Sequence, residues 1–88
     1  MSESDLPPDV RTVLRQLHLA AADAIDRGDV ETGRSAVDSA ETVTRTKVPP
    51  GSRREQLQTC HRAVERTLAA DDHDVAAEYL RRMADRLR

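Results

Sequence analysis

The stretch LRQLHLAAADAIDRGDVETG (residues 14–33) joins the end of one apolar, helix-periodic segment to the start of another through a Gly-Asp turn. It returns as LQTCHRAVERTLAADDHDVA (residues 57–76), with the apolar positions and the turn at matching places. Over residues 7–45 and 50–88 the same shift pairs seven identical residues, Pro7 with Pro50, Arg11 with Arg54, Leu14 with Leu57, His18 with His61, Ala20 with Ala63, Asp29 with Asp72 and Arg45 with Arg88. Because a repeat of this length corresponds to one supersecondary unit, the sequence predicts two tandem helical hairpins.

Apolar residues in each copy recur at steps of three and four, which places their side chains on one face of an α-helix. The pattern predicts helices over about residues 8–27, 30–45, 53–70 and 73–87. Residues 42–48 also have strand propensity, but a small-residue stripe in the second segment favours a helix packed closely on a neighbour. The expected buried faces are Val10, Leu14, Leu17, Ala21, Ala24 and Ile25, then Gly33, Val37, Ala40 and Thr44, then Leu57, Cys60, Val64 and Leu68, and finally Ala76, Tyr79, Leu80, Met83 and Leu87.

Turn residues mark the helix ends. Gly28 is typical of a left-handed helix end, and the residue after it can accept hydrogen bonds from free backbone N–H groups of the next helix. Side-chain caps are expected from Asp29 for the second helix, from Ser52 and Glu55 as a capping box for the third, and from Asp71 or Asp72 for the fourth. Connections this short force consecutive helices to lie antiparallel.

The sequence therefore predicts an all-α fold of four helices. A flexible tail (residues 1–6) precedes one helical domain (residues 7–88), made of hairpin 7–47, linker 48–51 and hairpin 52–88. Two arrangements satisfy this pattern: a closed up-down four-helix bundle and an open pair of stacked hairpins.

The two turn regions resemble a known family. Two segments are similar to the turn and second helix of a tetratricopeptide hairpin. The first is Gly28-Asp29-Val30-Glu31-Thr32-Gly33, followed by Val37 and Ala40, and the second is Asp71-Asp72-His73-Asp74-Val75-Ala76, followed by Leu80 and Met83. The resemblance covers about half of the chain, and Gly33 and Met83 stand where that family usually has Ala. It implies a helical scaffold that binds other proteins. Any tight helical hairpin also favours such turn residues.

Composition predicts a thin core. The chain has 88 residues, 38% of them hydrophobic, with one Tyr, no Phe and no Trp. Because so little apolar area is available, we expect a protein partner, or a second copy in a homodimer, to complete the fold. The chain is rich in Arg and Asp and has a single Lys. This composition resembles that of small proteins of halophilic archaea.

The charge and cysteine content exclude several classes of protein. A net charge of −2 provides no basic footprint for nucleic acid, and one cysteine, Cys60, cannot form an intramolecular disulfide. No apolar run is long enough for a signal peptide or a membrane span, so we expect a soluble, cytoplasmic protein without membrane contact. Cys60 is predicted on a buried face, where thiols are usually inert.

The paired histidines, His18 and His61, are candidate metal ligands, with Cys60 or an acid as a further ligand. Helices one and three of an up-down bundle run parallel on a diagonal, so inward-facing imidazoles could share a metal ion. Neither helix repeats His or Cys at spacings of three or four residues, which favours the alternative that both side chains are partly solvated and flank the apolar face. The segment Asp71-Asp72-His73-Asp74 lacks the 12-residue loop and terminal Glu of a calcium loop, and helix capping explains it.

Six arginines are candidate contacts for a phosphate or a protein partner: Arg53, Arg54, Arg81, Arg82, Arg86 and Arg88. Nearby acids such as Glu78 and Asp85 favour a salt-bridged surface instead, and a single Tyr gives no platform for stacking bases. The sequence contains no phosphate-binding glycine loop, nucleophile elbow or cofactor motif, so we expect no enzyme and no cofactor. The predicted function is protein interaction or self-association, and the alternative is a nucleic-acid accessory protein using the Arg-rich half.

Overall fold

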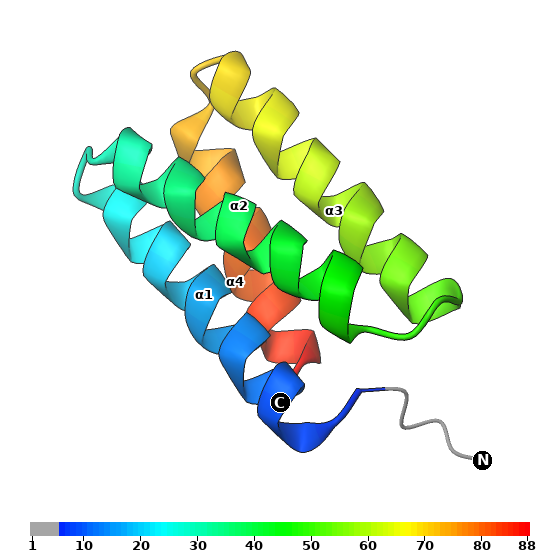
Figure 1. Ribbon diagram of the computed structural model, residues 1–88. Coiled ribbons are helices and arrows are strands. Elements are labelled where there is room, and N and C mark those ends of the chain that lie inside the picture. The colour runs from blue at the N-terminus through cyan, green and yellow to red at the C-terminus, as the bar shows by residue number, and fades with distance from the viewer. Residues whose placement is uncertain (1–5) are drawn as a thin grey trace.

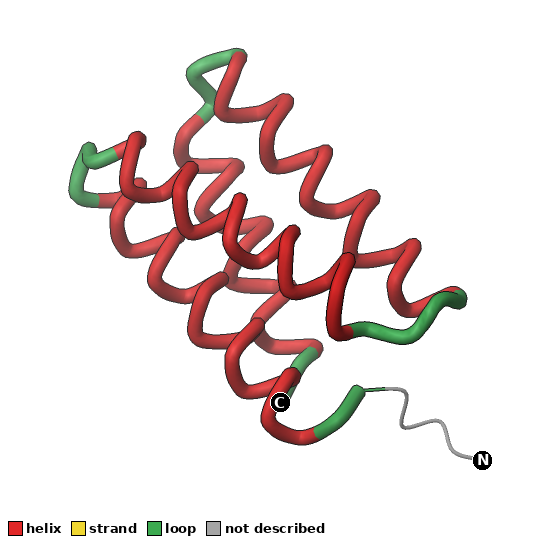
Figure 2. The backbone as a smooth tube through the Cα atoms, in the orientation of Figure 1, coloured by secondary structure: helices red, strands yellow, loops and turns green. Residues whose placement is uncertain are grey.

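The computed structural model describes residues 6–88 and contains four α-helices: α1 (Pro8–Asp26), α2 (Val30–Lys47), α3 (Ser52–Ala69) and α4 (His73–Arg86) (Figure 1). Each predicted boundary lies within two residues of the observed one. The described chain has no strand (Figure 2), and residues 42–47 continue α2 as a helix, so the alternative of a strand there is wrong. None of the described helices combines the length and apolar character needed to cross a membrane.

The helices form a closed, elongated bundle with overall dimensions of 40 × 19 × 19 Å. Each packs against two neighbours, in the order α1, α2, α3, α4 and back to α1, and the backbones of diagonal helices stay apart within residues 6–88. Because consecutive helices are antiparallel and α4 closes onto α1, the all-α prediction is confirmed as an up-down four-helix bundle.

Helix α3 lies farther from its neighbours than α1 does from α2 and α4 (Figure 1). Small residues explain the close approach of the other three helices. A Cβ atom added to Gly33 of α2 would lie 2.7 Å from Cγ1 of Ile25 on α1 and 3.3 Å from the carbonyl oxygen of Ala21, so only glycine fits. The buried face of α3 carries larger side chains, which hold its backbone away.

The core contains most of the predicted residues, with four corrections. Leu14, Val37, Val64 and Leu80 are among the buried residues at its centre. Val10, Leu17 and Cys60 are only half-buried and Tyr79 is 39% exposed, so their predicted burial is wrong. The buried stripes of their helices include His18, His61, Ala77 and Ala84 instead. Of the predicted flexible tail, residues 1–5 lie outside the described chain, and Leu6 is buried in the core.

The two hairpin turns have the same backbone geometry. Gly28 (φ +85°) and Asp71 (φ +58°) both adopt the left-handed conformation. In the first turn the N–H of Asp29 donates to the carbonyl of Ala24 at 2.9 Å, and in the second that of Asp72 donates to Thr67 at 2.8 Å. Because the same residues of each copy make the same helix-ending bonds, the structure supports the internal repeat.

The side-chain caps differ between the copies. The carboxylate of Asp29 accepts from the N–H of Thr32 at 3.3 Å, which confirms the predicted cap of α2. Asp72 occupies the equivalent position before α4 but makes no side-chain cap bond within the described residues, so the predicted side-chain cap of α4 is wrong. Gly51, not Ser52, precedes α3, and no side chain caps that helix, so the predicted capping box is wrong.

Replacing Asp71 with glycine is expected to stabilise the protein by about 0.5–1 kcal/mol, because glycine adopts a positive φ without the steric cost that a Cβ imposes. The matched change in the other turn, Gly28→Ala, should destabilise by a similar amount. Urea unfolding followed by circular dichroism measures both. If the Asp71→Gly variant were less stable than the wild type, the inference that Asp71 is strained by its positive φ would be wrong.

Candidate functional site

Two histidines meet at the centre of the bundle. His18 on α1 and His61 on α3 have exposed fractions of 0% and 2%. Their Nε2 atoms are 2.9 Å apart, which is hydrogen-bonding distance, although the two helices lie on a diagonal. The expectation of partly solvated flanking histidines is therefore wrong, and the alternative that both point inward is correct.

Glu41 on α2 completes this network. Its Oε1 atom lies 2.8 Å from Nδ1 of His61, and its side chain is 31% exposed. A carboxylate only accepts hydrogen bonds, so we assign the Nδ1 proton of His61 as the donor to Glu41. Nε2 of the same neutral ring then accepts from the Nε2–H of His18, which leaves Nδ1 of His18 as a buried acceptor without a partner.

Burial keeps the histidine pair neutral. Loss of hydration, followed by repulsion from His61, lowers the pKa of His18 to about 3. Burial also lowers the pKa of His61, while its hydrogen bond to Glu41 and the charges of Glu41 and Glu65 oppose that shift. The two imidazoles are therefore neutral at pH 7, and the Glu41 carboxylate beside them is partly exposed.

His18 and His61 are too few ligands to form a metal site by themselves. No group of three or more His, Cys, Asp or Glu side chains gathers around a possible metal position within residues 6–88. The two facing nitrogen atoms are hydrogen-bonded to each other, and Glu41 contacts the opposite side of His61. A tetrahedral zinc site would need further ligands that the described bundle centre does not supply.

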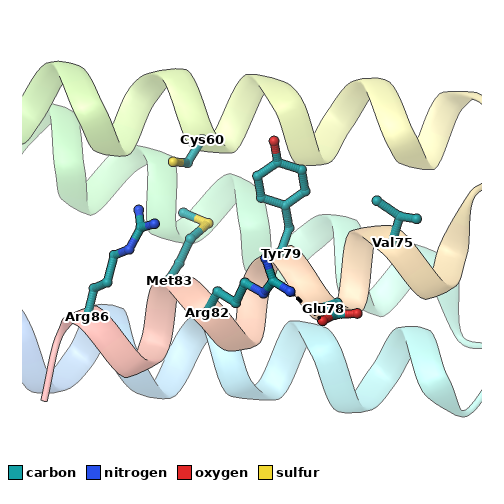
Figure 3. Close-up of a pocket in the computed structure, with 7 residues that line it drawn as sticks. All are labelled: Cys60, Val75, Glu78, Tyr79, Arg82, Met83 and Arg86. Atoms are coloured by element: carbon teal, nitrogen blue, oxygen red, sulfur yellow. Dashed lines mark hydrogen bonds and ion pairs between the residues drawn. The ribbon is translucent and has the colours of Figure 1, made fainter.

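A second candidate site is a surface groove between α3 and α4, with a volume of about 420 Å³ (Figure 3). Val75 and Tyr79 of α4 line it with exposed fractions of 42% and 39%, and Met83 of α4 lies mostly buried beneath. Half-buried Cys60 contributes from α3. We call this surface the α3–α4 groove. It exposes apolar side chains because α3 stands away from the rest of the bundle.

Charged residues border the α3–α4 groove. Glu78 and Arg82 form an ion pair of 2.9 Å along α4. Arg86 lies one turn further along, and together with Arg53 of α3 it lines a continuation of the groove beside Leu57 and Leu87. Neither Arg53 nor Arg86 forms an ion pair within the described residues.

The structure divides the six predicted arginines among several surfaces. Arg53, Arg82 and Arg86 border the groove, whereas the other three face elsewhere and already have partners. Arg81 pairs with Asp23 and Asp26 of α1, Arg54 donates to the carbonyl of Arg45 at 2.7 Å, and Arg88 pairs with Asp85 at 3.4 Å. The arginines therefore do not form one continuous basic face.

Sequence reasoning identified some members of each site without their arrangement. It paired His18 with His61 but did not include Glu41, whose position three turns into α2 gave no signal. It named Arg82 and Arg86 but placed Tyr79 inside the core. The groove had no sequence signal of its own, because it depends on the distance between α3 and α4.

Comparison with known proteins gave one match. The model of a family described as "Domain of unknown function (DUF8101)" matches residues 1–88. Neither the search of curated proteins nor the search of solved structures found a match.

Proposed function

Since the chain belongs to the DUF8101 family, whose description states no activity, we propose a function from its surface: it is a protein-interaction module that binds a partner helix in the α3–α4 groove. The observation that carries this proposal is the exposure of Val75 and Tyr79 beside each other on α4. Within residues 6–88 the only other large apolar side chain this exposed is Val13, on α1. Exposed apolar groups gathered in one groove are typical of binding surfaces.

The shape of the groove suits a helix. Val75, Tyr79 and Met83 follow one another at four-residue steps and so form a ridge along α4. The wider separation of α3 leaves a channel beside that ridge. A third helix lying in the channel would cover the apolar residues while the charged residues at its border met polar groups of the partner, as in other helix-in-groove complexes.

Site-specific photo-crosslinking tests this function. We expect p-benzoylphenylalanine in place of Tyr79 to form covalent adducts with protein, both in the purified sample and in an extract of cells that make the chain. The same group at Ser39, exposed on α2, should form none. Adding Val75→Asp should abolish the Tyr79 adducts by placing a charge in the groove, whereas Val13→Asp, at the same 42% exposure, should preserve them.

The proposed function is wrong if the photo-reactive group at position 79 forms no more protein adduct than the group at position 39 in either sample. It is also wrong if Val13→Asp and Val75→Asp reduce the adducts equally, because the interaction would then not depend on the groove. Circular dichroism of each variant confirms that the bundle is folded.

A further inference from the structure

Four residues along α4 and its N-cap are spaced symmetrically on either side of Tyr79. Asp72 and Arg86 lie seven residues before and after Tyr79, and Val75 and Met83 lie four residues before and after it. At 3.6 residues per turn the last four along the chain share one face of α4, and Asp72, the N-cap residue just before the helix, continues their line. We call these five residues the α4 stripe. Along the helix it runs from an acid through an apolar residue, an aromatic one and a second apolar one to a base.

We propose that the helix bound in the α3–α4 groove is α4 of a second copy of this chain, antiparallel to the first and related to it by a twofold axis at Tyr79. This inference rests on the proposed function, since it names the partner for the same groove. Antiparallel pairing reverses the order of residues, so Val75 of each copy lies over the other's Met83, which is 4% exposed at the base of the groove, and the two Tyr79 side chains meet. A twofold interface requires such a self-complementary surface.

The charges at the two ends of the stripe complement each other in this arrangement. Asp72 of each copy faces Arg86 of the other, about 10 Å from the axis on either side. Like charges would meet at both ends if the helices paired in parallel. The charge order along the stripe therefore selects the antiparallel orientation.

Both end residues are available for contact. Asp72 makes no side-chain cap bond, although its counterpart in the first hairpin, Asp29, uses its carboxylate for that purpose. Arg86 forms no ion pair with another residue of the described chain, in contrast to Arg81 and Arg82 on the same helix. The second copy supplies each of them with a partner of opposite charge.

A contact limited to one helix and one groove places the dimer at the small end of protein interfaces, so we expect micromolar dissociation. Analytical ultracentrifugation should show a 9.8 kDa monomer at low concentration and a species of twice that mass at high concentration. The photo-adduct at position 79 in the purified protein should join two copies through the segment 72–86.

Charge reversal provides the decisive test. Asp72→Arg gives a chain with Arg at both stripe ends, and Arg86→Asp gives one with Asp at both. Each variant alone should dimerise at least about tenfold more weakly, because like charges oppose each other at both ends. An equimolar mixture should regain wild-type affinity within about threefold, since each end then joins opposite charges. Asp74→Arg, a matched reversal off the stripe in the first turn of α4, should neither weaken the dimer nor restore it when mixed with Arg86→Asp.

Three results would overturn the second-copy proposal. The wild type could remain a monomer at millimolar concentration, the stripe variants could dimerise as the wild type does, or their mixture could stay monomeric while circular dichroism shows both folded. If the position 79 adduct in the extract then contains a different protein, the groove still binds protein and only the identity of the partner is wrong. Should Asp72→Arg fail to fold, Asp72→Asn and Arg86→Gln, each measured alone, remove one charge from the pair at each end, and dimerisation unaffected by either change would contradict the proposal.

Discussion

Acidification is expected to destabilise this protein between pH 7 and pH 3, with His18 alone removing up to about 1.4 kcal/mol of unfolding free energy per pH unit. The pKa of this buried imidazole is lowered to about 3, so it stays neutral when folded, whereas in the unfolded chain it takes up a proton below about pH 6.5. The unfolded state therefore binds more protons in this range. The stabilisation is complete above pH 6.5 and is lost progressively as the pH falls towards 3. His61, whose pKa is also lowered, acts in the same direction.

Urea unfolding at pH 7.5, 6, 5 and 4, with the protein concentration held constant, measures this dependence. The midpoint should fall at each step. The double variant His18→Leu with His61→Leu is the control, because it keeps every carboxylate but lacks both buried imidazoles, so its midpoint should vary much less over this range. A wild-type midpoint that is constant from pH 7.5 to 5 would show that the pair is not held neutral by burial.

Replacing one histidine is expected to harm the protein more than replacing both. With His61→Leu, the Nε2–H of His18 loses its acceptor and remains buried without a partner, at a cost of about 1–3 kcal/mol. His18→Leu should cost less, because it leaves His61 bonded to Glu41 and removes only a donor to its other nitrogen. Leucine at both positions replaces two buried polar groups with apolar ones of similar size, so the double variant should be as stable as the wild type or more so.

A double-mutant cycle of unfolding free energies measures the coupling between the two rings. We expect the loss in the double variant to be smaller than the sum of the two single losses by at least about 1 kcal/mol. Additive effects would mean that the two imidazoles do not form a direct bond. Thermal unfolding at pH 7.5, where the wild-type rings are neutral, provides a second ranking of the stabilities of the wild type, the two single variants and the double variant.

Local sequence signals determined the helices and turns well. The first helix was expected over residues 8–27 with Gly28 after its end, and both limits lie within two residues of the observed boundaries. The repeat predicted equivalent turns, which the matching bonds of Asp29 and Asp72 support. These features depend on interactions between near neighbours in the chain, which propensity and spacing capture.

The positions of His18 and Tyr79 depended on distant parts of the chain. His18 follows Leu14 by four residues and precedes Ile25 by seven, which is the spacing of the buried stripe. A polar ring is nevertheless expected outside the core unless a partner is known, and its partner is 43 residues away on another helix. Tyr79 was placed inside because it is apolar, yet α3 covers that side of α4 only in part and leaves the side chain 39% exposed. Periodicity identifies an apolar face without showing what covers it.

The set-back position of α3 has a consequence for motion. Regions with fewer close neighbours open at lower free energy than the whole protein unfolds, so α3 is the helix whose transient detachment costs least. Each such opening would carry His61 away and admit water to His18, whose ring could then take up a proton and delay the return of the helix. Below pH 6.5 the bundle would then spend more time with three helices assembled and the fourth released, long before it unfolds as a whole.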